Sequence, residues 1–83
     1  MSRYRIQYSP QADAARKAMP RQRRGEFESA MTSALGSDPY GGGSVPIGSD
    51  KDRREVTVTG VFVGYFVSQA VLVVTAVQIV DPH

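Results

Sequence analysis

Three cations within four positions are the densest group of chemistry-bearing side chains in this sequence. Lys51, Arg53 and Arg54 lie between Asp50 and Glu55. Guanidinium groups match the geometry of phosphate oxygens, and repulsion among neighbouring cations favours a neutral lysine that can accept a proton. The cluster predicts a site directed at phosphate. The neighbouring acidic residues leave a second interpretation open, in which this segment is a solvated and locally neutralised loop end.

Strand alternation separates the two arginines. If the chain is extended from residue 53 onward, Arg53 shares the polar face with Thr57 and Thr59, whereas Arg54 shares the face of the valines. Arg53 is therefore the predicted phosphate binder.

Two further side chains could take part in chemistry at a phosphate-directed site. His83 carries an imidazole that titrates near neutral pH, as a general acid requires, although a histidine at this position can also be a solvated end. Tyr65 can stack on a base or, alternatively, belong to the core.

A second set of cations lies in the N-terminal part of the chain. Residues 1–24 contain seven Lys and Arg against Asp13 alone, a net charge of +6, while residues 25–50 carry four acidic residues and no cation. Such segregation predicts a positive surface that meets a polyanion or an acidic partner, although outer helix faces commonly carry such charges too. The predicted RNA-binding residues of this set are Arg16, Lys17, Arg21, Arg23 and Arg24.

Composition argues against several classes of site. The chain of 83 residues has no cysteine and one histidine, which excludes disulfides, thiolate metal sites and multi-histidine metal sites within it. The glycine run at residues 41–43 lacks the GxxxxGKS/T spacing of a phosphate-binding loop. We therefore predict neither a metal nor a small-molecule cofactor.

The first half of the chain predicts one strand and two helices. Tyr4, Ile6 and Tyr8 alternate with polar residues, as in a half-buried strand. Ser9-Pro10 is a helix start, so a helix is expected from about Pro10 to Ala18, ended by Pro20. A second helix carries the apolar stripe Phe27, Ala30, Met31, Ala34 and Leu35, with Gly36 expected as a left-handed residue after its last turn.

The second half predicts a loop and three strands. Residues 36–52 have loop composition throughout, and strands are expected over Glu55–Thr59, Val61–Ser68 and Val71–Val80. The apolar stretch from Val61 to Val80 is rich in β-branched residues and broken by Ser68-Gln69, which favours paired strands over a membrane helix. The last strand is expected to be central and covered on both faces. With no signal peptide visible, the expected location is cytoplasmic.

These elements predict one α+β domain spanning residues 1–83. Its order is β-α-α-β-β-β, with a helical hairpin on one face of a four-stranded, mostly antiparallel sheet.

This order, together with three local motifs, resembles the RelE/ParE superfamily of toxins from bacterial type II toxin–antitoxin systems. YRIQYSPQADAARKAMP resembles its first strand and short helix, FESAMTSALGSDPYGGG its second helix and the following turn, and DRREVTVTGVFVGYFVSQAVLVVTAVQIVDP its final three-strand meander. The resemblance covers essentially the whole chain.

The resemblance implies a toxin neutralised by an acidic antitoxin, in most RelE-like members a ribosome-dependent mRNA endonuclease. It implies a metal-free reaction in which the 2′-OH attacks the adjacent phosphate, with Lys51, Arg53, Arg54 and His83 at the catalytic positions. Active members usually carry arginines on the third and fourth strands, yet VFVGYFV and VLVVTAVQIV contain no cation. Two alternatives therefore stay open: a ParE-like toxin that inhibits DNA gyrase, and a catalytically degenerate member that binds only its antitoxin.

Overall fold

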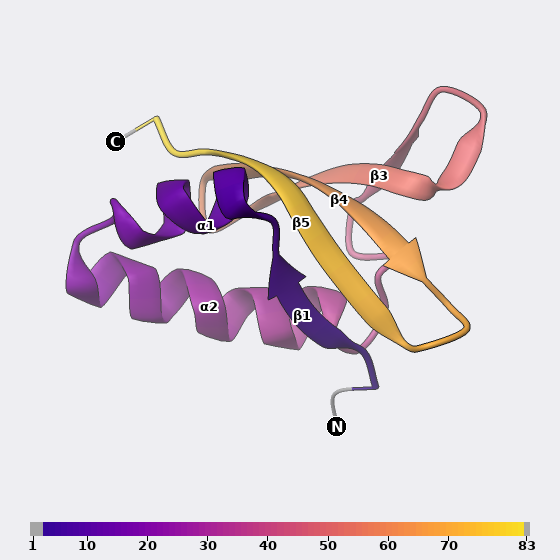
Figure 1. The fold of residues 1–83 in the computed structure, drawn as a ribbon, viewed down its shortest axis with the longest axis horizontal. Coiled ribbons are helices and arrows are strands. Elements are labelled where there is room, and N and C mark those ends of the chain that lie inside the picture. Colours follow the sequence, from indigo (N-terminus) through magenta and orange to yellow (C-terminus); the bar gives the residue numbers. More distant parts are fainter. Residues whose placement is uncertain (1–2, 83) are drawn as a thin grey trace.

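Five strands and two helices form the part of the chain described by the computed structural model, residues 3–82. In chain order they are β1 (Arg5–Tyr8), α1 (Pro10–Lys17), α2 (Arg21–Leu35), β2 (Val45–Ile47), β3 (Asp50–Val58), β4 (Val61–Ser68) and β5 (Val73–Val80). The sheet order is β1-β5-β4-β3-β2, with β1 parallel to β5 and the other pairs antiparallel. Both helices lie on one side of this mixed sheet (Figure 1), so the predicted α+β class is confirmed.

The prediction of four strands was wrong because residues 36–52 are not a loop throughout. Val45 pairs with Glu55 and Pro46 with Arg54, which adds β2 as a short edge strand. Pro46 is tolerated there because an edge strand leaves some N–H groups without a ladder partner. β3 begins at Asp50 rather than at Glu55, after a turn in which Gly48 has a φ of 65°.

The helices follow their local signals closely. The Ser9 hydroxyl accepts a hydrogen bond from the Ala12 N–H at 3.2 Å, and Pro10 occupies the first turn. The left-handed conformation predicted for Gly36 was wrong, since its φ is −66°. Instead, the Gly36 carbonyl accepts hydrogen bonds at 2.8 Å from the backbone N–H groups of Arg3 and Tyr4. This contact ties the end of α2 to the start of β1.

The core lies between the helices and the inner face of the sheet. Phe27, Met31 and Leu35 of α2 are almost completely buried, as are Val61, Val63, Tyr65 and Val67 of β4. β5 lies between β1 and β4 but is not covered on both faces as predicted, because Gln78 is exposed and Val80 keeps 48% of its surface exposed. The helices therefore shield one sheet face only.

The apolar stretch considered as a possible membrane span forms β4, a turn and β5. Among the described residues, no helix has both the length and the apolar character needed to cross a membrane.

The reversal between β3 and β4 is made by Thr59 and Gly60 alone. Both have positive φ, 49° and 79°, as a two-residue hairpin turn of type I′ requires, and the flanking Val58 and Val61 are paired. A threonine in this conformation is strained because its branched side chain crowds the backbone.

Replacing Thr59 by asparagine should stabilise the protein. Asn-Gly is the preferred sequence of such turns, so Thr59→Asn is expected to raise the free energy of unfolding by roughly 0.5–2 kcal/mol. Urea denaturation followed by circular dichroism measures this change. Gly60→Ala is the opposite control, expected to lower stability because alanine disfavours positive φ; stabilisation by both changes would contradict the assignment of this turn.

Candidate nucleic-acid interface

The sheet face away from the helices, called the open face below, carries the candidate site. Its outward positions form cross-strand rows, fixed by the strand register. Three of these rows are Gln7–Thr75–Phe66–Arg53, Gln78–Gly64–Glu55 and Val80–Phe62–Thr57, and a fourth is Arg5–Val73–Ser68.

Arg53 lies on the open face with its guanidinium over an aromatic ring. Its Cζ is 5.0 Å from the centroid of the Phe66 ring on β4, a cation–π distance. Lys51 is exposed two residues earlier on β3, in the part of the strand where the pairing with β2 is irregular. Asp52 and Arg54 both contact Tyr40 on the inner side, so the alternating residues Lys51 and Arg53 lie on the outer side. Two of the predicted catalytic residues therefore share one exposed surface.

Arg54 lies on the opposite face and holds the preceding loop. It is 8% exposed, and its guanidinium donates hydrogen bonds to the Lys51 carbonyl at 3.0 Å and to the Tyr40 and Ser44 carbonyls at 3.2 Å each. It also donates to the Ser44 hydroxyl at 3.0 Å. These hydrogen bonds give Arg54 a structural role, and the catalytic role expected for Arg54 stays a prediction.

Tyr40 closes the same loop against the sheet. Its hydroxyl donates to the Asp52 carboxylate at 2.6 Å and accepts from the Gln69 side chain at 2.8 Å. Desolvation, and then the hydrogen bond to Asp52, raise the pKa of Tyr40 to about 12. A tyrosine from the loop thus joins β3 to the turn between β4 and β5.

Tyr65 belongs to the core and does not lie on the interface. The residue is fully buried, its hydroxyl donates to the Pro39 carbonyl at 2.5 Å, and burial raises the pKa of Tyr65. The base-stacking role predicted for Tyr65 is corrected, since no surface of the ring faces solvent. The alternative interpretation of a core tyrosine is the one observed.

Ion pairs engage both cations of α1, Arg16 and Lys17. The Arg16 guanidinium pairs with Asp13 and with Glu28 of α2, and its Cζ is 5.0 Å from the Tyr8 ring centroid. Lys17 pairs with Asp13 at 3.0 Å, although its side chain stays 65% exposed. Hydrogen bonds from Arg16 and Lys17 hold the pKa of Asp13 below its usual value. Arg16 therefore links the two helices, and only Lys17 keeps substantial contact with solvent.

Three predicted RNA-binding arginines lie at the start of α2. Arg23 donates two hydrogen bonds to Asp81, at 2.9 and 3.0 Å, and its pKa is raised mainly by this contact. Arg21 is exposed and Arg24 partly exposed, and neither pairs with an acidic group among residues 3–82. The structure thus leaves Arg21 and Arg24 available. His83, the predicted general acid, lies outside the described residues.

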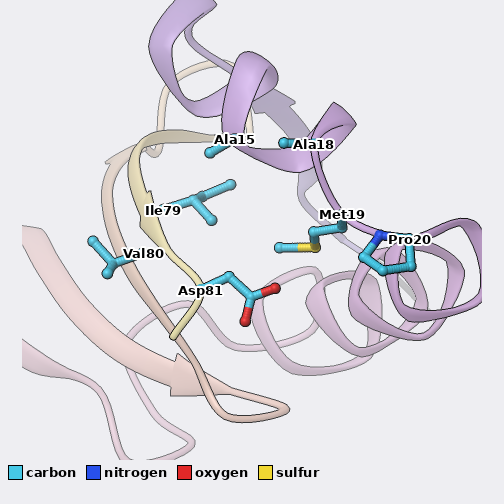
Figure 2. A pocket seen from close by; sticks show the side chains of 7 residues that line it. All are labelled: Ala15, Ala18, Met19, Pro20, Ile79, Val80 and Asp81. Atoms are coloured by element: carbon cyan, nitrogen blue, oxygen red, sulfur yellow. The ribbon is translucent and has the colours of Figure 1, made fainter. Parts of the chain in front are cut away.

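A pocket of about 350 Å³ lies between the helix–helix turn and the end of β5. Figure 2 shows its lining side chains, with Ile79 and Met19 facing its interior and the Asp81 carboxylate at one side. Its walls are mostly apolar, and Arg23 binds Asp81 beside it. None of the predicted catalytic or RNA-binding residues lines this pocket.

Sequence reasoning missed the partners of Arg53 on the neighbouring strand. The two-residue turn at Thr59-Gly60 pairs Val58 with Val61, and counting back along both strands reaches Arg53 opposite Phe66. Knowing that the turn has two residues is therefore enough to predict this pairing from the sequence. By contrast, nothing in the sequence indicated that Tyr40 would meet Asp52 and Gln69.

Known proteins do not assign this chain to a family: a scan against protein-family models and a search of curated proteins each returned no match. The arrangement of the side chains therefore carries the functional argument.

The two adjacent arginines should differ sharply in their effect on stability. Arg54→Met is expected to lower the free energy of unfolding by about 2–3 kcal/mol, because it leaves buried carbonyl groups without donors. Arg53→Met, the matched control, should change it by less than about 0.5 kcal/mol, since that side chain is exposed. Chemical denaturation of both variants measures the difference, and equal losses would contradict the assignment of inward and outward faces.

Stability should fall between pH 10 and pH 12 through Tyr40. The unfolded tyrosine loses its proton near pH 10 while the folded one retains it up to about pH 12, so the unfolded state is favoured as pH rises through this window. Tyr40→Phe should be less stable at neutral pH but should lose less of its remaining stability over that window. Denaturation at a series of pH values tests this, and equally steep losses in both proteins would overturn the linkage.

Proposed function

We propose that this chain is the toxin of a bacterial type II toxin–antitoxin system, with the RelE/ParE fold, acting in the cytoplasm as a ribosome-dependent mRNA endonuclease. The element order supports this proposal, since a strand and a helical hairpin precede an antiparallel meander. Within this order, β2 is a short addition at the sheet edge.

The observation that carries the proposal is the position of Arg53. Its guanidinium is exposed on the open face, held over Phe66, and shares that face with Lys51. A guanidinium that is fixed on one side and open to solvent on the other suits a backbone phosphate.

Three side chains share the steps of the proposed reaction. Lys51 accepts the proton of the 2′-OH, whose oxygen attacks the adjacent phosphorus. The bond from phosphorus to the 5′ oxygen breaks, leaving a 2′,3′-cyclic phosphate and a 5′-OH. Arg53 stabilises the charge that develops on the phosphate oxygens. His83 is the proposed donor of the proton to the leaving oxygen.

The helix cations would dock the protein on ribosomal RNA. Arg21, Arg24 and Lys17 keep exposed surface near the turn between the helices. Contacts of this kind are made to phosphates without base specificity and weaken as salt rises.

The composition of the open face favours a second candidate, a toxin without nuclease activity. The outward positions of β4 and β5 in its four rows carry Phe62, Gly64, Phe66, Ser68, Val73, Thr75, Gln78 and Val80, none of them a cation. Loss of one group aimed at transition-state charge typically costs about 10²–10³ in rate. Inhibition of DNA gyrase supercoiling by the purified protein would support a ParE-like target, whereas harmless expression without a partner would support a member that only binds its antitoxin.

The expected partner in all of these cases is an acidic antitoxin. The positive N-terminal region and the open sheet face suit an acidic segment that orders on binding. An adjacent reading frame for a small acidic protein that co-purifies with this chain would support the pairing.

Replacing Arg53 separates cleavage from other kinds of growth arrest. Arg53→Ala is expected to lower the rate of mRNA cleavage about 10²–10³-fold, because a cation at the reacting phosphate is lost. The measurement is a map of new RNA 5′ ends after induced expression. Arg5→Ala is the matched control, because Arg5 is an exposed arginine of the same sheet, on β1, three strands from β3. Arrest by the wild-type protein without any new 5′ ends would contradict the nuclease proposal.

A further inference from the structure

A small hollow on the open face lies next to the proposed phosphate site. Its volume is about 150 Å³, well below the ~300–1,000 Å³ of pockets for drug-sized ligands. This size suits one planar group rather than a larger molecule. The hollow is lined by Gly43, Val45, Glu55, Val56, Thr57 and Phe62.

The lining combines a ring, an apolar wall and one charged acceptor. Phe62 is partly exposed on β4, and Val45 of the edge strand keeps 49% of its surface exposed. The chain passes the hollow at Gly43 with a φ of 85°, and a Cβ built there meets no other atom within 4 Å. Because glycine has no side chain, Gly43 places none between a bound planar ring and Phe62 or Val45.

Glu55 supplies the polar recognition. Its carboxylate forms no hydrogen bond or ion pair with any other residue in the range 3–82, although it is only partly exposed. An ionised carboxylate accepts hydrogen bonds with two oxygens and donates none. The hollow therefore selects a planar group that presents two neighbouring donors.

Among the four RNA bases, guanine alone meets this requirement. Its Watson–Crick edge places a ring N–H beside an amino group, and both can donate to one carboxylate. Adenine and cytosine present one amino group beside an unprotonated ring nitrogen, and uracil presents one N–H between two carbonyls. Each of these would bring an acceptor against the Glu55 oxygens.

The spacing to Arg53 agrees with a nucleotide. Arg53 and Glu55 are two residues apart on the same face of β3, about 6.6 Å along the strand. A ribose links a base to its phosphate over a comparable length. We propose that Glu55, Phe62 and Val45 form a guanine-binding subsite that selects the nucleotide attached to the phosphate held by Arg53. Its use in choosing a cleavage position rests on the nuclease function proposed above.

Binding of mononucleotides tests the subsite without any cleavage. Titration of the full chain with GMP, AMP, CMP and UMP, followed by NMR shifts of the Phe62 and Glu55 amides, should show GMP binding at least about tenfold more tightly than the others. Glu55→Gln should remove this preference, because an amide presents one acceptor and one donor, whereas Glu26→Gln on the exposed side of α2 should retain it. Equal affinities for all four nucleotides, or a preference unchanged in Glu55→Gln, would overturn the proposal.

Mapping of RNA 5′ ends tests its use in cleavage. RNA cut by the wild-type protein is expected to have guanine at one fixed position beside the cut. Glu55→Gln should still cut RNA, but its preference for guanine at that position should be at least about tenfold weaker. Cuts without a guanine bias would overturn the placement beside Arg53. Glu55-dependent binding of GMP with no cleavage at all would support the subsite and refute the nuclease function, so the two failures are distinguishable.

Discussion

The register between β3 and β4 decides the chemistry of this protein. Side chains alternate between the two faces of a strand, so a slip of one residue would exchange the buried and exposed sets. Thr59 and Gly60 prevent that slip by closing a two-residue turn that pairs Val58 with Val61. Because of this register, one arginine of the adjacent pair faces solvent while the other lies under the loop.

The inward Arg54 supports the surface on which the outward Arg53 lies. Arg54 holds the Tyr40 and Ser44 carbonyls, so the loop before β2 is fixed against β3. That loop leads into β2, and Val45 at its start forms one wall of the hollow beside Glu55. A buried cation with satisfied hydrogen bonds thus shapes the surface on which Arg53 and Glu55 are presented.

Charge on the two sides of the molecule serves different purposes. On the helical side, Arg16 and Arg23 are engaged by acidic partners, and these contacts join α1 to α2 and α2 to the end of β5. On the open face, Arg53 rests on an aromatic ring and Glu55 has no ion-pair partner in the described part of the chain. A count of basic residues does not distinguish these states, because each depends on which elements pack together.

The sequence by itself determined the elements whose signals are local. Ser9-Pro10 started α1, the stripe through Phe27 placed α2, and alternation assigned Arg53 to the polar face, since each depends only on neighbours along the chain. The tertiary structure decided what depends on distant partners: β2 formed because β3 offered it an edge, Tyr65 was buried by the helices, and Arg54 was satisfied by the carbonyls of a loop. Local sequence propensities do not predict such contacts, because the stabilising energy comes from burial and hydrogen bonds between segments that only the fold brings together.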